Sequence, residues 1–180
     1  MRMTVSDEDL AKAAANGDRQ AFASLLERHY DRLFALAFRL TGQRAEAQDL
    51  TQDICAALPA KLASYRGQSK VTTWLYRVAV NAAHDRRRRR ATYIKASDGW
   101  GDWELARQDE ISVGRDQLDW LTAAMAHLSH DLRDTLALVL DDLTHAEVAS
   151  ILGVSEGTIS WRVSEAKKRL RAIRTEEGAL

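Results

Sequence analysis

The chain is poor in the residues that crosslink or interrupt a fold. Its 180 residues include one cysteine, Cys55, and one proline, Pro59. A lone cysteine excludes an internal disulfide, and we expect the Cys55 thiol to be a small buried apolar group. Glycine is sparse and falls at the ends of helical patterns, and runs of alternating β-branched residues are absent. These absences predict a nearly all-helical protein.

Signals for secretion or membrane insertion are lacking as well. Residues 1–10 turn acidic at once and contain no apolar stretch like that of a signal peptide. No segment approaches the ~18–20 consecutive apolar residues that are needed to cross a bilayer. We therefore expect a soluble, cytoplasmic protein with no membrane insertion.

Neither sign of charge is in excess, because 26 basic side chains balance 26 acidic ones. The charges are nevertheless segregated: residues 86–90 are five consecutive arginines, and residues 162–174 hold six basic side chains against one acid. Between them, residues 98–119 hold seven acids against two arginines. Solvated helix faces are one interpretation, but like charges on adjacent turns repel each other. Two DNA-facing surfaces separated by a non-binding connector fit this pattern better.

Cap and stop signals divide the chain into helices. Ser6 begins a first helix that ends at Gly17, and Asp18 caps a long second helix that ends at Gly42. A third helix is expected from about 44 to 58, where Pro59 interrupts or bends it. The remaining helical patterns run from about 72 into the arginines, over 116–128, over 131–140 and through the motif described next.

The segment 143–170 reads LTHAEVASILGVSEGTISWRVSEAKKRL and contains two helical patterns separated by a turn. Thr144 and Glu147 have the spacing of a capping box at the start of the first helix. Gly153 can adopt the positive φ that ends this helix, and Ser155 is a good N-cap for the second. The sequence therefore predicts a helix-turn-helix whose second helix can enter a DNA major groove. A hairpin buried in a bundle is the alternative, but it needs neither an outward tryptophan nor the flanking charge.

Residues 91–115 look different from the rest, with two glycines around Trp100, many acids and little periodicity. This composition predicts a flexible acidic linker. We therefore expect an all-α fold of two small helical domains, residues 1–90 and 116–180, with the helix-turn-helix in the second.

Two patterns in the first ninety residues add to this picture. Asp49, Gln52 and Asp53 share one helix face, which could receive a basic partner or simply be solvated. Residues 65–81 interleave aromatic and basic side chains, a combination that suits unpaired nucleic acid because each base stacks on an aromatic face at roughly 1–3 kcal/mol. Trp74 either takes part in such stacking or packs beneath the loop and shapes it.

The order of the motifs GDRQAFASLLERHY, AEAQDLTQD, SYRGQSKVTTWLYRVAVNAAHDRRRRR and LGVSEGTISWRVSEAKKRL resembles that of bacterial RNA polymerase sigma factors. The chain is similar to the small, two-domain extracytoplasmic-function group of the sigma-70 family. This resemblance implies that the first domain binds the polymerase clamp and the −10 promoter element. It implies that the second domain binds the β-subunit flap and the −35 element, with the linker passing through the polymerase cleft.

On the positions that match the family's motifs, the resemblance implies three groups of site residues. The core-polymerase-binding residues are Asp49, Leu50, Gln52 and Asp53. The −10 DNA-binding residues are Tyr65, Arg66, Gln68, Ser69, Lys70, Trp74, Arg77, Asn81, Arg86 and Arg87. The −35 DNA-binding residues are Ser155, Glu156, Thr158, Ser160, Trp161, Arg162 and Lys168. Trp161 stands where the family more often has a small or basic residue, so its contact could be a thymine methyl, a sugar or a protein partner.

The resemblance also implies what accompanies the protein. Its partners would be core RNA polymerase through the β and β′ subunits, promoter DNA and an anti-sigma factor. No cofactor and no catalytic residue are implied, because promoter opening can draw its energy from trapping bases that only melting exposes.

Two other functions compete with this interpretation. A free-standing regulator would bind duplex DNA tightly by itself, usually as a dimer on a palindrome, but no dimerisation helix is evident. An enzyme would need a site, and the nearest approach is the pair His127 and His130 with Asp131 beside them. No cysteine and no HExxH motif join them, so exposed histidines at a capped helix end explain the cluster better.

Overall fold

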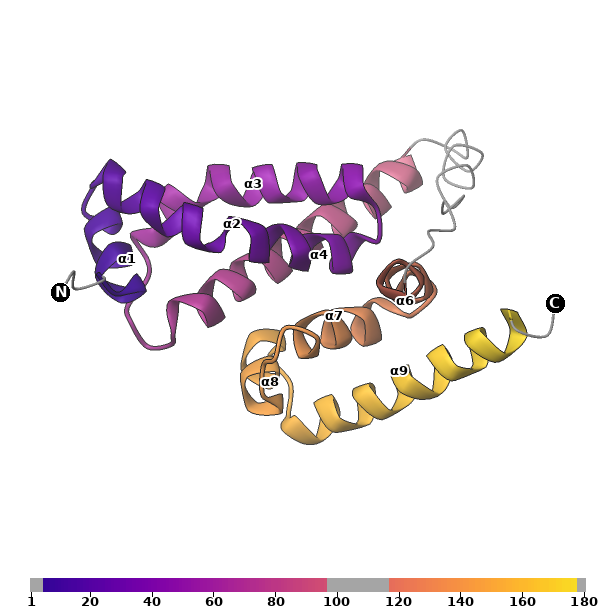
Figure 1. Ribbon diagram of the computed structural model, residues 1–180. Helices are drawn as coiled ribbons and strands as arrows, with labels where there is room; N and C mark the ends of the chain where they lie inside the picture. Colours follow the sequence, from indigo (N-terminus) through magenta and orange to yellow (C-terminus); the bar gives the residue numbers. More distant parts are fainter. Residues whose placement is uncertain (1–4, 97–116, 178–180) are drawn as a thin grey trace.

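The computed structural model describes residues 5–96 and 117–177, and all regular elements in these ranges are α-helices (Figure 1). The first range contains α1 (Asp7–Ala15), α2 (Arg19–Thr41), α3 (Arg44–Leu62) and α4 (Val71–Ala96), here called the first unit. The second range contains α6 (Gln117–Ala126), α7 (His130–Val139), α8 (His145–Leu152) and α9 (Glu156–Glu177), the second unit. The predicted all-helical fold is confirmed, whereas most of the expected linker lies outside the described residues.

The cap signals in the sequence set the helix ends of the first unit. The Ser6 hydroxyl accepts a hydrogen bond from the Asp9 amide, and the Asp18 carboxylate accepts from the first amides of α2. Gly42 has a φ of 76°, which ends α2 in the left-handed conformation that glycine adopts without strain. These ends agree with the predicted ones.

Of the two expectations for Pro59, interruption of the third helix is wrong. α3 continues through Pro59 to Leu62. A proline inside a helix costs about 3 kcal/mol, because its ring removes one hydrogen bond and crowds the preceding turn. Leu58 and Leu62 on either side are both buried in the core, and each such burial contributes about 1.5–3 kcal/mol. Packing of this turn therefore outweighs the local cost of the proline.

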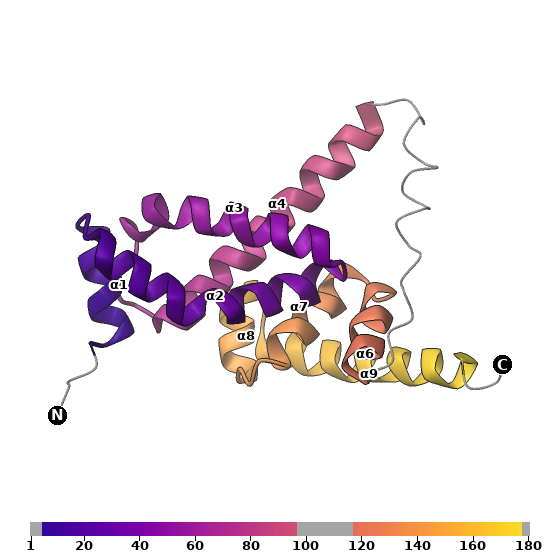
Figure 2. The ribbon, with the colours of Figure 1, turned by 45° about the horizontal axis from the view of Figure 1, so that its top comes forward.

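α4 extends beyond the arginine run to Ala96, so the first residues of the expected linker, 91–96, are helical. Its last turns project away from the other helices of the unit, as Figure 2 shows. Ion pairs to α3 relieve the repulsion between the arginines: Arg86 Nη1 lies 3.0 Å from Asp53 Oδ2, and Arg90 Nη1 lies 2.7 Å from Glu46 Oε1. These pairs offset part of the repulsion between the consecutive arginines.

The buried apolar residues of both units form one continuous cluster. α2 contacts all three other helices of the first unit, with Leu33, Leu36 and Leu40 turned inward. In the second unit α7 and α8 pack on α9, where Leu138 and Ile159 are fully buried. This arrangement follows the helical spacing of the apolar residues.

The two units are packed against each other. α7 lies along α2, and α8 lies against α4 (Figures 1 and 2). Arg39 on α2 donates to the Ala137 carbonyl on α7 at 3.0 Å, which ties the units at their centre. No spacing or composition in the sequence predicts this contact.

Candidate nucleic-acid interface

The predicted helix-turn-helix is formed by α8 and α9. Thr144 accepts from the Glu147 amide while the Glu147 carboxylate accepts from the Thr144 amide, so the capping box is complete. Gly153 ends α8 at a φ of 68°. The Ser155 hydroxyl then caps α9 by accepting from the Thr158 amide at 3.1 Å. All four local predictions for this motif are confirmed.

The outward face of α9 is polar around one large aromatic side chain. Trp161 is 62% exposed, although a tryptophan side chain is usually packed against its neighbours. Glu156, Ser160 and Lys168 are also exposed. The Ser160 hydroxyl lies 3.0 Å from His145 Nδ1 at the start of α8, so this contact orients one side chain of the face.

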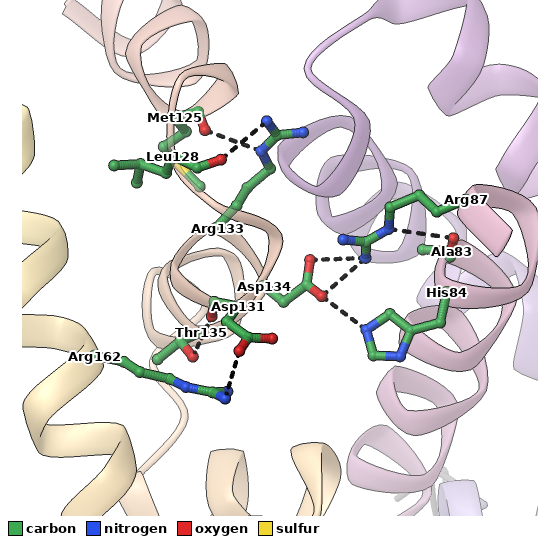
Figure 3. A network of polar contacts seen from close by, with 10 residues as sticks. All are labelled: Ala83, His84, Arg87, Met125, Leu128, Asp131, Arg133, Asp134, Thr135 and Arg162. Atoms are coloured by element: carbon green, nitrogen blue, oxygen red, sulfur yellow. Dashed lines mark hydrogen bonds and ion pairs between the residues drawn. The ribbon is translucent and has the colours of Figure 1, made fainter. Parts of the chain in front are cut away.

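Two of the expected −35 residues point elsewhere. The Arg162 side chain is only 14% exposed and donates to Asp131 Oδ2 on α7 at 2.9 Å (Figure 3). Thr158 is half-buried, and its hydroxyl lies 2.9 Å from the Ser155 hydroxyl within the cap. Both positions flank the buried stripe of Ile159 and Val163, and Arg162 connects α9 to α7 in this arrangement.

The expected −10 loop, residues 65–70, is shaped by a buried tyrosine. The Tyr65 ring lies 5.4 Å from the Trp74 ring, and its hydroxyl donates to the Ser69 carbonyl at 2.7 Å. Burial raises the pKa of Tyr65, and Glu8 adds to the rise, so the hydroxyl remains a donor. Arg66 and Gln68 are exposed, and Ser69 is half-buried. Of the two roles considered for Trp74, packing beneath the loop is the one in this structure.

A stripe of expected −10 residues follows one face of α4. Lys70, Trp74, Arg77 and Asn81 recur at intervals of four, three and four residues, and we call them the α4 stripe. Asn81 is exposed. The two cations of the stripe contact α8 instead of solvent alone: Lys70 Nζ lies 3.5 Å from Glu147 Oε1, and Arg77 donates to the Ser150 hydroxyl at 2.9 Å. The second unit therefore covers part of Arg77, whereas the Lys70 side chain remains 77% exposed.

The remaining −10 arginines are also engaged. Arg86 bridges to Asp49 and Asp53 on α3, which are themselves expected polymerase contacts. Arg87 donates to both oxygens of Asp134 on α7, at 2.9 and 2.8 Å. The Asp134 side chain is only 3% exposed and also lies 2.8 Å from His84 Nε2 (Figure 3).

The expected polymerase face on α3 is partly as predicted. Asp49, Gln52 and Asp53 are exposed on one side of the helix, so their carboxylates and amide remain accessible. Leu50 is 1% exposed and belongs to the core. One residue further along a helix turns by about a quarter of the circle, which takes Leu50 from the acidic face to the inside.

Sequence reasoning missed the acidic residues on the second unit that receive these cations. Asp134 and Asp141 lie on or next to α7, and neither was singled out. Asp134 stands between Arg133 and Thr135 in a polar stretch from Leu132 to Leu136, so its neighbours in the sequence carry no signal of its burial. An acid on a buried helix face usually has a cationic partner.

Within residues 5–96 and 117–177, no helix is long and apolar enough to cross a membrane. The same residues contain no group of three or more His, Cys, Asp or Glu side chains that could hold a metal ion.

Comparison with known families and proteins gives matches over both units. Residues 25–93 match the model of sigma-70 region 2, and residues 118–170 match the model of sigma-70 region 4. The chain is 33% identical over 172 residues to the ECF RNA polymerase sigma factor SigM of Mycobacterium tuberculosis, covering 93% of this chain and 84% of SigM. It is 26% identical over 172 residues to SigW of Bacillus subtilis, covering 89% of this chain and 92% of SigW.

Two solved structures resemble the fold. The sigma factor RpoE of Bartonella quintana, crystallised with the anti-sigma factor NepR, gives a TM-score of 0.74 at 26% identity and covers 87% of this chain and 98% of its own. CnrH in complex with the cytosolic domain of CnrY gives a TM-score of 0.67 at 26% identity, with 94% and 97% covered.

Proposed function

The chain belongs to the extracytoplasmic-function sigma factors of the sigma-70 family, and from this premise we propose how its surfaces divide the work. As a sigma factor it recognises promoters and directs transcription initiation by RNA polymerase. The first unit binds the −10 element and the polymerase clamp, and the second binds the −35 element and the β-subunit flap. The observation that carries this division is the presence of two separate candidate surfaces, on α4 and on α9, in the two matched regions.

The −10 element is assigned to the exposed side chains of the loop and the α4 stripe. Tyr65 and Trp74 pack against each other and hold the loop, so Arg66 and Gln68 are presented on a rigid frame. Such a frame favours capture of a base that melting has released, because less loop entropy is lost on binding. Lys70, Arg77 and Arg87 supply the cations for the adjacent phosphates.

The −35 element is assigned to the outward face of α9. Trp161, Ser160 and Glu156 are exposed together near the start of this helix. In a helix-turn-helix the first turns of the second helix meet base edges, and an indole can contact a thymine methyl there. Lys168 lies further along, where a phosphate contact fits. Arg162 acts by connecting α9 to α7.

Polymerase binding is assigned to Asp49, Gln52 and Asp53, whose exposed side chains suit a basic partner surface. Core polymerase is cytoplasmic, so we place the protein there. We also propose an anti-sigma factor as a partner, a proposal supported by the two similar sigma factors that were crystallised with such proteins. The protein is an initiation factor, and we propose that it has no catalytic site of its own.

Run-off transcription with bacterial core enzyme on a promoter library tests the proposal. We expect initiation at defined start points that requires the chain, and weak binding of the isolated chain to duplex DNA. Strong specific duplex binding without polymerase, together with no initiation, would instead favour a free-standing regulator.

The polymerase face is tested by charge reversal. Asp49→Lys with Asp53→Lys should reduce core binding by about tenfold or more, because like charges replace attraction at a contact surface. Both side chains are more than half exposed, so the core should persist, and circular dichroism checks that α4 stays helical once the pairs with Arg86 are lost. Glu27→Lys with Asp31→Lys is a matched control, since these exposed acids have the same spacing on α2. Equal pull-down of core polymerase by all three proteins would reject the assignment.

A further inference from the structure

The carboxylate of Asp141, which follows α7, contacts side chains from two helices of the first unit, α2 and α4. Asp141 Oδ1 accepts from Arg39 Nη2 at 3.0 Å, and Asp141 Oδ2 lies 3.4 Å from Arg32 Nη2. The Tyr76 hydroxyl donates to the same carboxylate. The Asp141 side chain is only 15% exposed, so these contacts are largely shielded from water. Shielding strengthens ion pairs, and loss of one partner leaves the others poorly satisfied.

The other contacts between the units follow the same pattern of charge. Apart from Tyr76, each side chain of the first unit that meets an acidic or polar side chain of the second in the contacts above is basic. The groups of the second unit are Asp134, Asp141, Glu147 and Ser150, and we call them the closing face. Their arrangement on α7, α8 and the intervening turn forms one surface that meets α2 and α4.

Three cations that meet the closing face are assigned to −10 DNA. Arg77 donates to the Ser150 hydroxyl at 2.9 Å and Arg87 to Asp134 at 2.9 Å, whereas Lys70 Nζ lies 3.5 Å from Glu147 and its side chain is 77% exposed. Carboxylate and hydroxyl oxygens here take the hydrogen-bond positions that phosphate oxygens would take. A cation cannot satisfy both partners fully, so DNA and the closing face compete for the same side chains.

We propose that the free chain inhibits itself in this way: the closing face occupies the cations of the −10 surface, with Asp141 as the anchor that holds the units together. The proposal rests on the assignment of α4 to the −10 element. Binding of −10 DNA then requires the units to separate. If the open form is a minor state of about 1–10%, the affinity of the free chain for DNA is reduced by that fraction.

Asp141 is the position to change because its partners Arg32, Arg39 and Tyr76 are not assigned to DNA or polymerase. Asp141→Asn removes the charge and should open the chain. The neighbouring Asp142 is exposed and makes no ion pair with the first unit among the described residues. Asp142→Asn removes the same charge one residue away, and asparagine accepts its positive φ, so it is the matched control. Arg39→Gln tests the same anchor from the other unit.

The experiment uses the full chain without polymerase and has two readouts. Small-angle X-ray scattering reports the radius of gyration, and fluorescence anisotropy reports affinity for a labelled pool of random single strands, on the order of 20 nucleotides long. Asp141→Asn and Arg39→Gln should both increase the radius of gyration and raise the DNA affinity by about tenfold or more. Asp142→Asn should change neither. Circular dichroism checks the helical content.

Three results would overturn the proposal. The first is an unchanged radius of gyration in folded Asp141→Asn and Arg39→Gln. The second is an increased radius without a gain in DNA affinity, because closure would then not compete with DNA. The third is loss of helical structure in both variants, which would make these contacts part of the folding core. None of these depends on the transcription assay, in which failure of the unmodified chain to initiate would instead overturn the proposed function.

Discussion

The α4 stripe and the outward face of α9 both offer aromatic and polar side chains, but they differ in what lies against them. On α4 Arg77 donates to the Ser150 hydroxyl of α8 and Trp74 supports a loop, whereas the Lys70 side chain next to them stays 77% exposed. On α9 Trp161 is 62% exposed and Ser160 is oriented by a contact from its own unit. The comparison teaches that composition marks a surface for nucleic acid, whereas tertiary packing decides whether that surface is accessible in the free chain.

The largest effect is expected on the open surface. Trp161→Ala should reduce transcription that depends on a −35 element by about tenfold or more, as removal of a central exposed aromatic contact often does. Its thermal stability should change little, because the side chain packs on few neighbours. Tyr30→Ala on α2, another partly exposed aromatic outside the assigned surfaces, is the control. A large loss of stability in Trp161→Ala would show that this face is not free.

The second prediction separates a base contact from a supporting one on α9. If Arg162 acts through Asp131, then Arg162→Ala and Asp131→Asn should lower −35-dependent transcription to a similar extent, and the double variant should lose no more than either. The expected stability loss is about 0.2–1 kcal/mol for this partly exposed pair. A double-mutant cycle from urea unfolding and run-off assays measures both. An effect of Arg162→Ala alone on transcription would assign it to a base.

A third prediction concerns the hydrogen bond by which Tyr65 holds the loop of residues 65–70. Tyr65→Phe keeps the ring against Trp74 but removes the hydrogen bond to the Ser69 carbonyl. We expect a stability loss of about 1 kcal/mol and a few-fold lower yield of open promoter complexes, because the loop is less ordered. Permanganate footprinting with polymerase measures the melted bases. Tyr30→Phe is the control. An equal footprint in both variants would show that the Tyr65 hydroxyl does not help to order the loop.

The smallest expected effect is the change of folding stability with pH that His130 on α7 causes. Burial lowers the pKa of His130, and the nearby Arg87 and Arg133 lower it further. The unfolded chain therefore takes up this proton first on acidification, so stability is lost as pH falls below the ordinary histidine value of about 6.5. His130→Gln stays neutral and should lose less stability between about pH 7.5 and about pH 5.5. Urea midpoints at the two pH values measure the difference, and parallel losses in both proteins would contradict it.

Much of the local structure was predictable because it depends on neighbours in the chain. Ser6, Asp18 and Ser155 cap helices with their own side chains, and Gly42 and Gly153 end helices at positive φ. The helix-turn-helix and its exposed tryptophan follow from the same short-range rules. The acidic face of α3 was also predictable from residues three and four apart.

The direction of individual side chains was harder to predict. Leu50 lies beside Asp49 in the sequence but turns into the core, and Arg162 lies beside Trp161 but pairs with α7. Likewise Pro59 carries a strong local signal for a helix end that core packing overrides. In each case the decisive neighbour comes from another helix, which no spacing rule identifies.

The sequence by itself determined the helices, their caps, the order of the two units and the residues capable of meeting DNA, because these depend on short-range hydrogen bonds and apolar periodicity. Only the tertiary structure decided which of those residues are accessible. Asp134 and Asp141 meet arginines that lie far away in the chain, and such long-range pairs join the two helical units together with the apolar side chains of one continuous cluster.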